Sequence, residues 1–143
     1  MKFFLLADVV TRLRNGYLVG KEEVEVYNSK FIRKVLDILI SIGYIVSYTF
    51  KEGKQFNGIE TNVEFLVVKL KYVTKTGKGK IPAVKYIKTL STPAKRTYIP
   101  WGGDLLDTTH KLGLKIISTS QGLKTGYDAF RLKIGGEAIL EIF

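Results

Sequence analysis

The stretch SKFIRKVLDILISIGYI, from Ser29 to Ile45, carries the clearest structural pattern in the chain. Its apolar residues recur every three or four positions, as on one face of an amphipathic helix. Ser29 suits the N-cap position, and Gly43 stands where a left-handed residue ends a helix. The pattern therefore predicts a helix between these two residues, with an apolar face made of Ile32, Val35, Leu36, Leu39 and Ile42.

Upstream of this stretch, the sequence predicts another helix and a strand. Leu6, Val9, Val10 and Leu13 have the spacing of one helix face. We expect Asn15-Gly16 to supply the left-handed residue that ends this helix. Arg12 and Arg14 would then lie near its C-terminus, off the apolar stripe, where the helix dipole favours cations. Alternation over 23–26 predicts a short strand between the two helices.

Downstream of this stretch, alternation predicts strands over 44–50 and 63–73, separated by the turn-rich segment KEGKQFNG. The first lobe is therefore expected to run helix, strand, helix, strand, strand. The segment TKTGKGK, residues 74–80, is rich in Gly and Lys and marks the expected boundary. It is either a flexible linker or a connection that seeks phosphates. The expected organisation is an N-terminal lobe over 1–73, a connection over 74–84 and a C-terminal lobe over 85–143.

The C-terminal lobe is predicted to be mostly β. Short strands are expected over 85–90, after the turn in STPAKRTYIPW, over 114–119 and in the closing GGEAILEIF. One short helix is expected over 127–133, with Thr125 as its N-cap, and a helical turn is expected within 105–112. The fold class predicted for the whole chain is α+β with two small lobes.

The composition favours a partner that is a polyanion. The chain has 143 residues, of which 45% are apolar, so it can bury a core. It carries 23 Lys and Arg against 13 Asp and Glu, a net charge of +10. A small domain this basic is usually attracted to nucleic acid, and an acidic membrane surface ranks behind. No apolar stretch has the length of a membrane span, and FFLLADVV lacks the cleavage pattern of a signal peptide.

The sequence offers little for catalysis or metal binding. Ser118 and Ser120 could act as nucleophiles only with a base in reach, and His110 is the single histidine. With no cysteine and one histidine, only carboxylates remain as metal ligands, and no phosphate-binding loop is present. We therefore expect no cofactor, no metal, no small-molecule substrate and no enzymatic activity. An enzyme using one of the two serines is kept as an alternative.

Two segments of the C-terminal lobe suit RNA. In IISTSQG, residues 116–122, three consecutive hydroxyl side chains could form a rim that binds ribose and base edges. They could equally stabilise a turn through local hydrogen bonds. In KRTYIPW, Lys95 and Arg96 could contact phosphates. Tyr98 and Trp101 could stack on bases or pack in the core.

Five blocks, in this order, resemble the small-subunit ribosomal protein eight family, the universal S-eight family, over nearly the whole chain. LADVVTRLRNG corresponds to the family's first-helix signature, and SKFIRKVLDILISIGYI corresponds to its second helix with the turn after it. TLSTPAKRTY corresponds to the S-K-P-G-R-R-x-Y segment, and LGLKIISTSQG corresponds to the G-x-x-I-x-S-T-S-K-G block. IGGEAILEIF corresponds to the G-G-E ending. Ala94 replaces a family glycine, so that turn is expected to differ, and Gln121 replaces a lysine, which removes a phosphate contact.

The resemblance implies a structural protein that binds the central domain of small-subunit ribosomal RNA directly, supports subunit assembly and contacts neighbouring small-subunit proteins. The alternative is a stand-alone RNA-binding or mRNA-regulatory protein. The Lys-, Ile- and Tyr-rich composition resembles a product of an AT-rich genome, such as an organellar one, which favours a mitochondrial ribosome over a bacterial one. The mitochondrial matrix is the expected location, and the bacterial cytoplasm or a plastid is the alternative. Carried over residue by residue, the implied RNA contacts are Ser118, Thr119, Ser120, Gly122, Ser91, Lys95, Arg96 and Tyr98, followed by Arg12, Arg14, Ser29 and Lys30.

Overall fold

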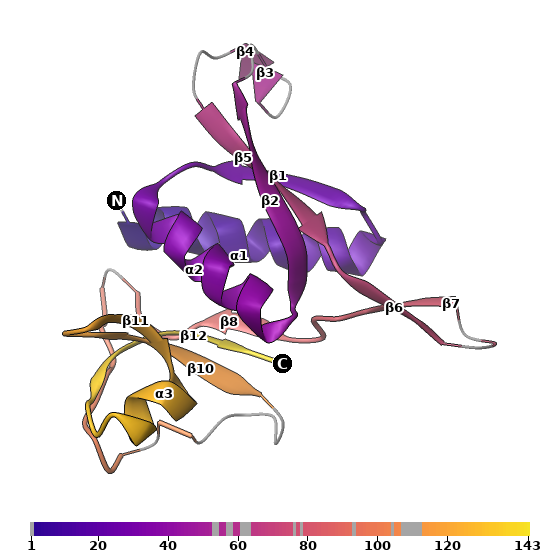
Figure 1. Ribbon diagram of the computed structural model, residues 1–143. Helices are drawn as coiled ribbons and strands as arrows, with labels where there is room; N and C mark the ends of the chain where they lie inside the picture. Colours follow the sequence, from indigo (N-terminus) through magenta and orange to yellow (C-terminus); the bar gives the residue numbers. More distant parts are fainter. Residues whose placement is uncertain are drawn as a thin grey trace. The chain divides into compact units, whose positions relative to one another are not determined.

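The computed structural model describes the chain except for residues 1, 53–54, 57–58, 61–63, 76, 78, 93, 104 and 107–112. It divides into two compact units, with Leu5–Val84 forming the first and Lys85–Phe143 the main part of the second. We call them the N unit and the C unit. Each contains helix and strand (Figure 1), so the predicted α+β class is confirmed.

The N unit is built from α1 (Lys2–Val19), β1 (Glu23–Tyr27), α2 (Lys30–Ile42), β2 (Ile45–Glu52), β3 (Gln55–Phe56), β4 (Ile59–Glu60), β5 (Glu64–Leu70), β6 (Tyr72–Lys75) and β7 (Gly79–Pro82). Its main sheet has the order β1-β5-β2, and both pairings are antiparallel. Leu66 and Val68, which alternate along the central strand β5, are fully buried, and so is Val26 of the neighbouring strand β1. The predicted order of helices and strands in this lobe is therefore confirmed, with short additional strands.

Helix α2 begins and ends where the sequence predicts. The Ser29 hydroxyl accepts a hydrogen bond from the backbone N–H of Ile32 at 3.1 Å. Gly43 has a φ of 96°, and its N–H donates to the carbonyls of Leu39 and Ile40. The apolar face is buried as expected, except that Ile42 at the end of the helix is 36% exposed.

Helix α1 is longer than the sequence predicts. The expectation that Asn15-Gly16 ends this helix is wrong, because the helix continues to Val19 and Gly20 is the residue with the positive φ, 87°. Gly16 is required for a different reason. A Cβ there would lie 2.5 Å from a side-chain carbon of Val24 on β1, so only glycine allows the helix to approach the strand this closely. Arg12 and Arg14 are consequently inside the helix and not in its last turn.

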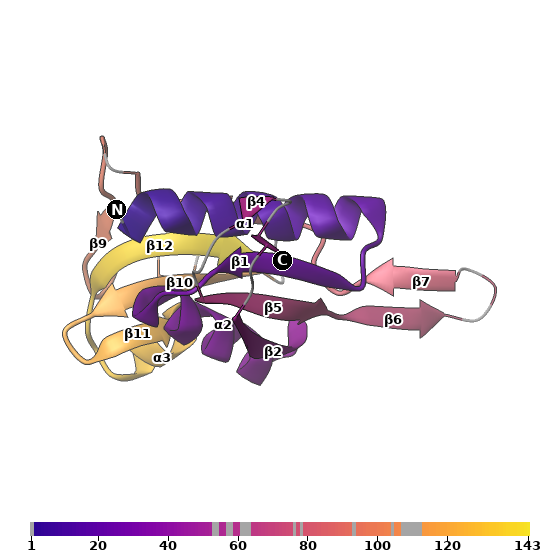
Figure 2. The same cartoon turned by 90° about the horizontal axis from the view of Figure 1, so that it is seen from above.

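The strand expected over 63–73 is interrupted at Lys71, where β5 gives way to β6. Figure 2 shows β6 continuing beyond β5 and β7 returning beside it. This hairpin pairs Tyr72 with Pro82 and Lys75 with Gly79, so most of it lies in the segment 74–84 that was expected to be a connection. The contacts place the division after Val84. The expected organisation into a lobe over 1–73, a connection over 74–84 and a lobe over 85–143 stays a prediction.

The C unit is built from β8 (Ile87–Thr89), β9 (Tyr98–Ile99), β10 (Leu114–Thr119), β11 (Gly122–Thr125), α3 (Gly126–Arg131) and β12 (Gly136–Ile142). The sheet has the order β11-β10-β12-β8, and β9 also pairs with β12. Thr125 caps α3 as predicted, because its hydroxyl accepts from the N–H of Asp128 at 3.1 Å. Strand β11 was not predicted. The helical turn expected within 105–112 lies mostly outside the described residues.

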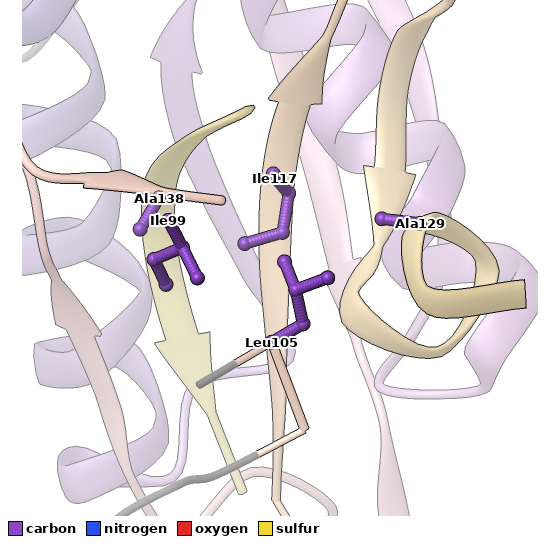
Figure 3. Packing of buried hydrophobic residues seen from close by; sticks show 5 residues of the cluster. All are labelled: Ile99, Leu105, Ile117, Ala129 and Ala138. Atoms are coloured by element: carbon purple, nitrogen blue, oxygen red, sulfur yellow. The ribbon is translucent and has the colours of Figure 1, made fainter. Parts of the chain in front are cut away.

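The core of the C unit lies between one face of this sheet and α3. Figure 3 shows its members: Ile99, Leu105, Ile117, Ala129 and Ala138. Ala129 is the member that α3 contributes, and it is fully buried. Helix α3 therefore presents its opposite side to solvent.

Candidate nucleic-acid interface

Ser118 follows Ile117 in β10, so it faces the opposite side of the sheet. Ile117 pairs with Ala138 of β12, and both belong to the buried core that includes Ala129 of α3. A β-bulge on β12 separates this pair from the preceding one, Ile116 with Leu140. Ser118 pairs with Glu137 and is partly exposed.

The turn that follows is held by Thr119. Its hydroxyl donates to the carbonyl of Gly122 at 2.7 Å and accepts from the N–H of Gln121 at 3.1 Å. Gly122 has a φ of 102°, with open space around the position of a Cβ, so its backbone conformation is what favours glycine there. Ser120 and Gln121 are exposed at the end of the turn. The hydroxyl of Thr119 therefore serves the turn, whereas Ser120 faces solvent. We call Ser118–Gly122 the hydroxyl turn.

The second motif forms a tight loop. The N–H of Thr92 donates to the carbonyl of Lys95 at 2.9 Å, and the N–H of Lys95 donates to the Thr92 hydroxyl at 3.0 Å. Lys95 and Arg96 are exposed. Among the described non-glycine residues only Lys133 has a positive φ, so Ala94 fits this turn without a left-handed backbone. We call Thr92–Arg96 the basic loop.

Ser91, just before the basic loop, lies inside the fold. Its side chain is 3% exposed. The hydroxyl donates to the carbonyl of Ala138 on β12 at 2.6 Å and accepts from the N–H of Thr97 at 3.0 Å. This arrangement ties both ends of the basic loop to the sheet.

The sheet brings the two motifs together. Glu137 of β12 pairs with Ser118 of β10 on one side and with Tyr98 of β9 on the other. Neighbouring strands are about 4.8 Å apart, so Ser118 and Tyr98 lie on one face at the same end of the sheet, with one strand between them. Tyr98 is 67% exposed. The hydroxyl turn and the basic loop, distant in sequence, therefore border one surface.

Glu137 is the residue of this surface that the sequence reasoning missed. It is 8% exposed, and its Oε2 atom is buried without a hydrogen-bond partner among the described residues. The G-G-E motif was the available signal. The second glycine of the motif, Gly136, is needed because a Cβ there would lie 2.2 Å from the backbone oxygen of Ser118. The motif thus permits the close approach of β12 and β10 beside the hydroxyl turn.

The four predicted contact residues of the N unit, Arg12, Arg14, Ser29 and Lys30, have different environments. The guanidinium of Arg12 forms an ion pair with Asp8 at 2.8 Å and lies 5.8 Å from the centre of the Tyr27 ring. Arg14 is exposed, and it lies about 200° further round the helix than Arg12. Ser29 is occupied as a helix cap, and Lys30 beside it is exposed. The structure therefore does not gather these residues into one group as it does in the C unit.

The exposed groups of the C-unit surface are hydroxyls, cations and one aromatic ring. These groups can bind ribose hydroxyls, phosphates and bases. His110, the only histidine, lies outside the described residues. In the described parts of the chain, no three His, Cys, Asp or Glu side chains gather as a metal site would require. No described helix has the length and hydropathy of a membrane span.

Comparison with known proteins identifies the family. The family model "Ribosomal protein S8" matches residues 5–143. The chain is 39% identical over 139 residues to "Small ribosomal subunit protein uS8" of Anaplasma marginale (strain Florida), which covers 96% of each chain. It is 34% identical to the uS8 protein of a Nitratiruptor species, covering 97% of each, and 35% identical to "Small ribosomal subunit protein uS8c" of Tupiella akineta, covering each completely.

The chain belongs to the ribosomal protein S8 family. The resemblance found in the sequence is therefore confirmed. The family is a structural family of the small ribosomal subunit, so the expectation of a ribosomal protein that is not an enzyme is confirmed as well. The alternative of a serine enzyme is dropped.

Proposed function

We propose that this chain binds the central domain of small-subunit ribosomal RNA directly through the hydroxyl turn, the basic loop and Tyr98, and supports assembly of the subunit. The observation that carries the proposal is the register Tyr98–Glu137–Ser118, which joins the two motifs on one surface. Neighbouring small-subunit proteins are the proposed protein partners.

The environments of the residues suggest how the contact is divided among them. Ser118 and Ser120 offer hydroxyls to ribose and base edges, and Gly122 lets the RNA backbone come close. Lys95 and Arg96 are the proposed phosphate contacts, and Tyr98 is the proposed stacking residue.

Three of the predicted positions are proposed to act mainly through the fold. Ser91 and Thr119 hold the basic loop and the hydroxyl turn, so they position the RNA contacts, and Ser29 caps α2. Arg12, Arg14 and Lys30 remain proposed N-unit contacts of lower rank.

The proposed compartment is a ribosome inside an organelle, and the mitochondrion is the one expected. The support is the Lys-, Ile- and Tyr-rich composition alone. The relatives named above come from Anaplasma marginale, Nitratiruptor and Tupiella akineta, and one of them is a uS8c protein, so a bacterial or plastid ribosome is the alternative. Localising the tagged protein in its own cells against markers for both organelles decides between these compartments.

Two measurements on the untagged protein test the proposed function. Filter binding to a transcript of the central domain of its own small-subunit RNA should give a specific affinity, at least about a thousandfold above that for an unrelated RNA of equal length. In cell extracts the protein should sediment with small subunits. Specific binding without sedimentation would favour the stand-alone RNA-binding protein. Absence of both would contradict the proposal.

A further inference from the structure

A group of aromatic side chains lies exposed in the C unit and has no role in the surface described above. Trp101 is 49% exposed, Tyr127 is 52% exposed and Phe130 is 47% exposed. Large aromatic side chains are normally buried for most of their area, so three half-exposed rings in one unit point to a binding role. We call these three residues the aromatic platform.

The platform is held in place by α3. Tyr127 and Phe130 are three residues apart and lie on one side of the helix, opposite the buried Ala129 (Figure 3 shows Ala129 on the core side). The indole N–H of Trp101 donates to the backbone carbonyl of Phe130 at 3.1 Å. The ring centres of Trp101 and Phe130 are 6.5 Å apart, with 32° between the ring planes. The indole is therefore fixed at its polar end while half of its surface stays open.

The charge of the C unit indicates which kind of partner the aromatic platform binds. Residues 85–143 contain nine Lys and Arg against five Asp and Glu. Beside the platform, Arg131 and Lys133 are exposed, and the one acidic residue of α3, Asp128, is paired with Arg131 at 2.7 Å. Open rings in a unit with net positive charge complement an unpaired base and its phosphates, because every base has a face that stacks.

We propose that Trp101, Tyr127 and Phe130 stack on an unpaired base of small-subunit RNA, with Arg131 and Lys133 next to its phosphates. This inference rests on the proposed function and adds a second contact to it. It is carried by the exposure of the rings, the fixed geometry of Trp101 against Phe130 of α3 and the basic charge of the C unit.

The chain provides its own probe, because Trp101 is its only tryptophan. A transcript of the central domain is titrated into the full-length protein while tryptophan emission is followed. Stacking predicts a quench that saturates with the same midpoint as filter binding. Phe130→Ala should weaken binding about tenfold, in line with the loss of one base–aromatic contact. It should keep the Trp101 hydrogen bond, because the acceptor is a backbone atom.

Two variants serve as controls, and circular dichroism checks that every variant folds. Phe130→Tyr keeps a stacking ring and should bind as the wild type does. Phe50→Ala removes an aromatic side chain of similar exposure, 57%, from the N unit and should leave both affinity and quench unchanged.

The remaining results would each contradict the proposal that the platform stacks on RNA. The transcript could bind in a salt-dependent way while tryptophan emission stays unchanged and Phe130→Ala binds with wild-type affinity. This result would contradict stacking on the platform, and the proposed function would still stand. Emission that responds to added small-subunit proteins and not to RNA would make the platform a protein contact. Emission that changes with protein concentration alone would indicate a second copy. A transcript that does not bind at all contradicts the proposed function itself.

Discussion

Ser118, Thr119 and Ser120 are consecutive hydroxyl residues with different environments. Ser118 shares a face with Glu137, Thr119 is bonded within the turn, and Ser120 is exposed. The sequence left two interpretations open for all three, a binding rim or a turn. The structure shows that Thr119 holds the turn, and it leaves the other two hydroxyls available.

We predict that replacing both Ser118 and Ser120 by Ala weakens RNA binding about tenfold or more without a loss of stability. Each lost hydrogen bond should contribute about 0.5–1.5 kcal/mol to binding. Filter binding and thermal melting on the same double variant measure both effects. A variant that melts early and binds with wild-type affinity would mean that these hydroxyls only support the fold.

Thr119→Val is the matched comparison. Valine keeps the branched shape and removes the hydroxyl that bonds to Gly122 and Gln121. Here the melting temperature should fall, by an amount equivalent to about 0.5–1.5 kcal/mol, and the affinity of the folded protein should change less than in the serine variant. The opposite pattern would exchange the roles assigned to these residues.

Residue type in a motif does not reveal which way a side chain faces. The resemblance placed Ser91 with Lys95 and Arg96 as one contact segment, but Ser91 is buried with its hydroxyl bonded to Ala138 and Thr97. That difference depends on β12, more than 40 residues away in sequence. Ser29 shows the easier case, because a helix cap is decided by its immediate neighbours and the sequence predicted it.

At the level of elements, local signals predicted helix α2, helix α3 with its cap and strand β10. The errors arose where tertiary packing decides. Gly16 looked like a helix end, but it is needed for the close approach of Val24. Strand β11 has little apolar pattern of its own and is defined by its pairing with β10. The β-bulge between Ile116 and Ile117 likewise arises from the pairing with β12.

The end of α2 gives a prediction about backbone conformation. Gly43→Val should lower the free energy of unfolding by about 1–2 kcal/mol, because a β-branched residue is strained at a φ of 96°. Space is not the cause, since a Cβ would meet only the Lys71 ammonium at 3.4 Å. Gly43→Asn should cost less, because asparagine tolerates left-handed backbone better. Equal stability of all three proteins in urea unfolding would refute this account of the helix end.

Tyr17 joins α1 to the two connections that follow α2 and β5. Its hydroxyl donates to the carbonyl of Tyr44 at 2.6 Å and accepts from the N–H of Lys71 at 3.2 Å. Burial raises the pKa of Tyr17 from 10.0 to about 12, partly offset by the hydrogen bond from Lys71. The folded state therefore holds this proton more tightly than the unfolded state does.

The stability contributed by this proton is complete below pH 10 and is lost as the pH rises towards about 12. Tyr17→Phe should be less stable than the wild type near neutral pH, and the difference between the two proteins should shrink over this alkaline range. Urea unfolding of both proteins across the range provides the measurement. A difference that stays constant with pH would show that Tyr17 does not titrate in this way.

At the scale of the whole molecule, composition predicted the class of partner, and the family match confirmed a ribosomal protein. The net charge of +10 leads to a further prediction, a steep fall in RNA affinity with salt. Each neutralised phosphate should contribute roughly 0.7–0.9 to the slope of log K against log salt concentration. A slope near zero would contradict the electrostatic part of the account.

The basic loop should account for a defined part of that slope. Replacing Lys95 and Arg96 together by Gln should reduce it by about 1–2, if each contacts one phosphate. Lys34→Gln, which removes an exposed lysine from α2, is the control and should leave the slope nearly unchanged.

The central claim is that the hydroxyl turn and the basic loop together form the RNA-binding surface. Protein–RNA crosslinking in purified small subunits, with the crosslinked sites mapped on both partners, tests it most directly. We predict crosslinks from residues 95–98 and from residues 118–122 to neighbouring nucleotides of one region of the small-subunit RNA, because the register Tyr98–Glu137–Ser118 places the two segments on one surface. Crosslinks confined to other segments of the chain, or reaching widely separated RNA regions from these two, would contradict the claim.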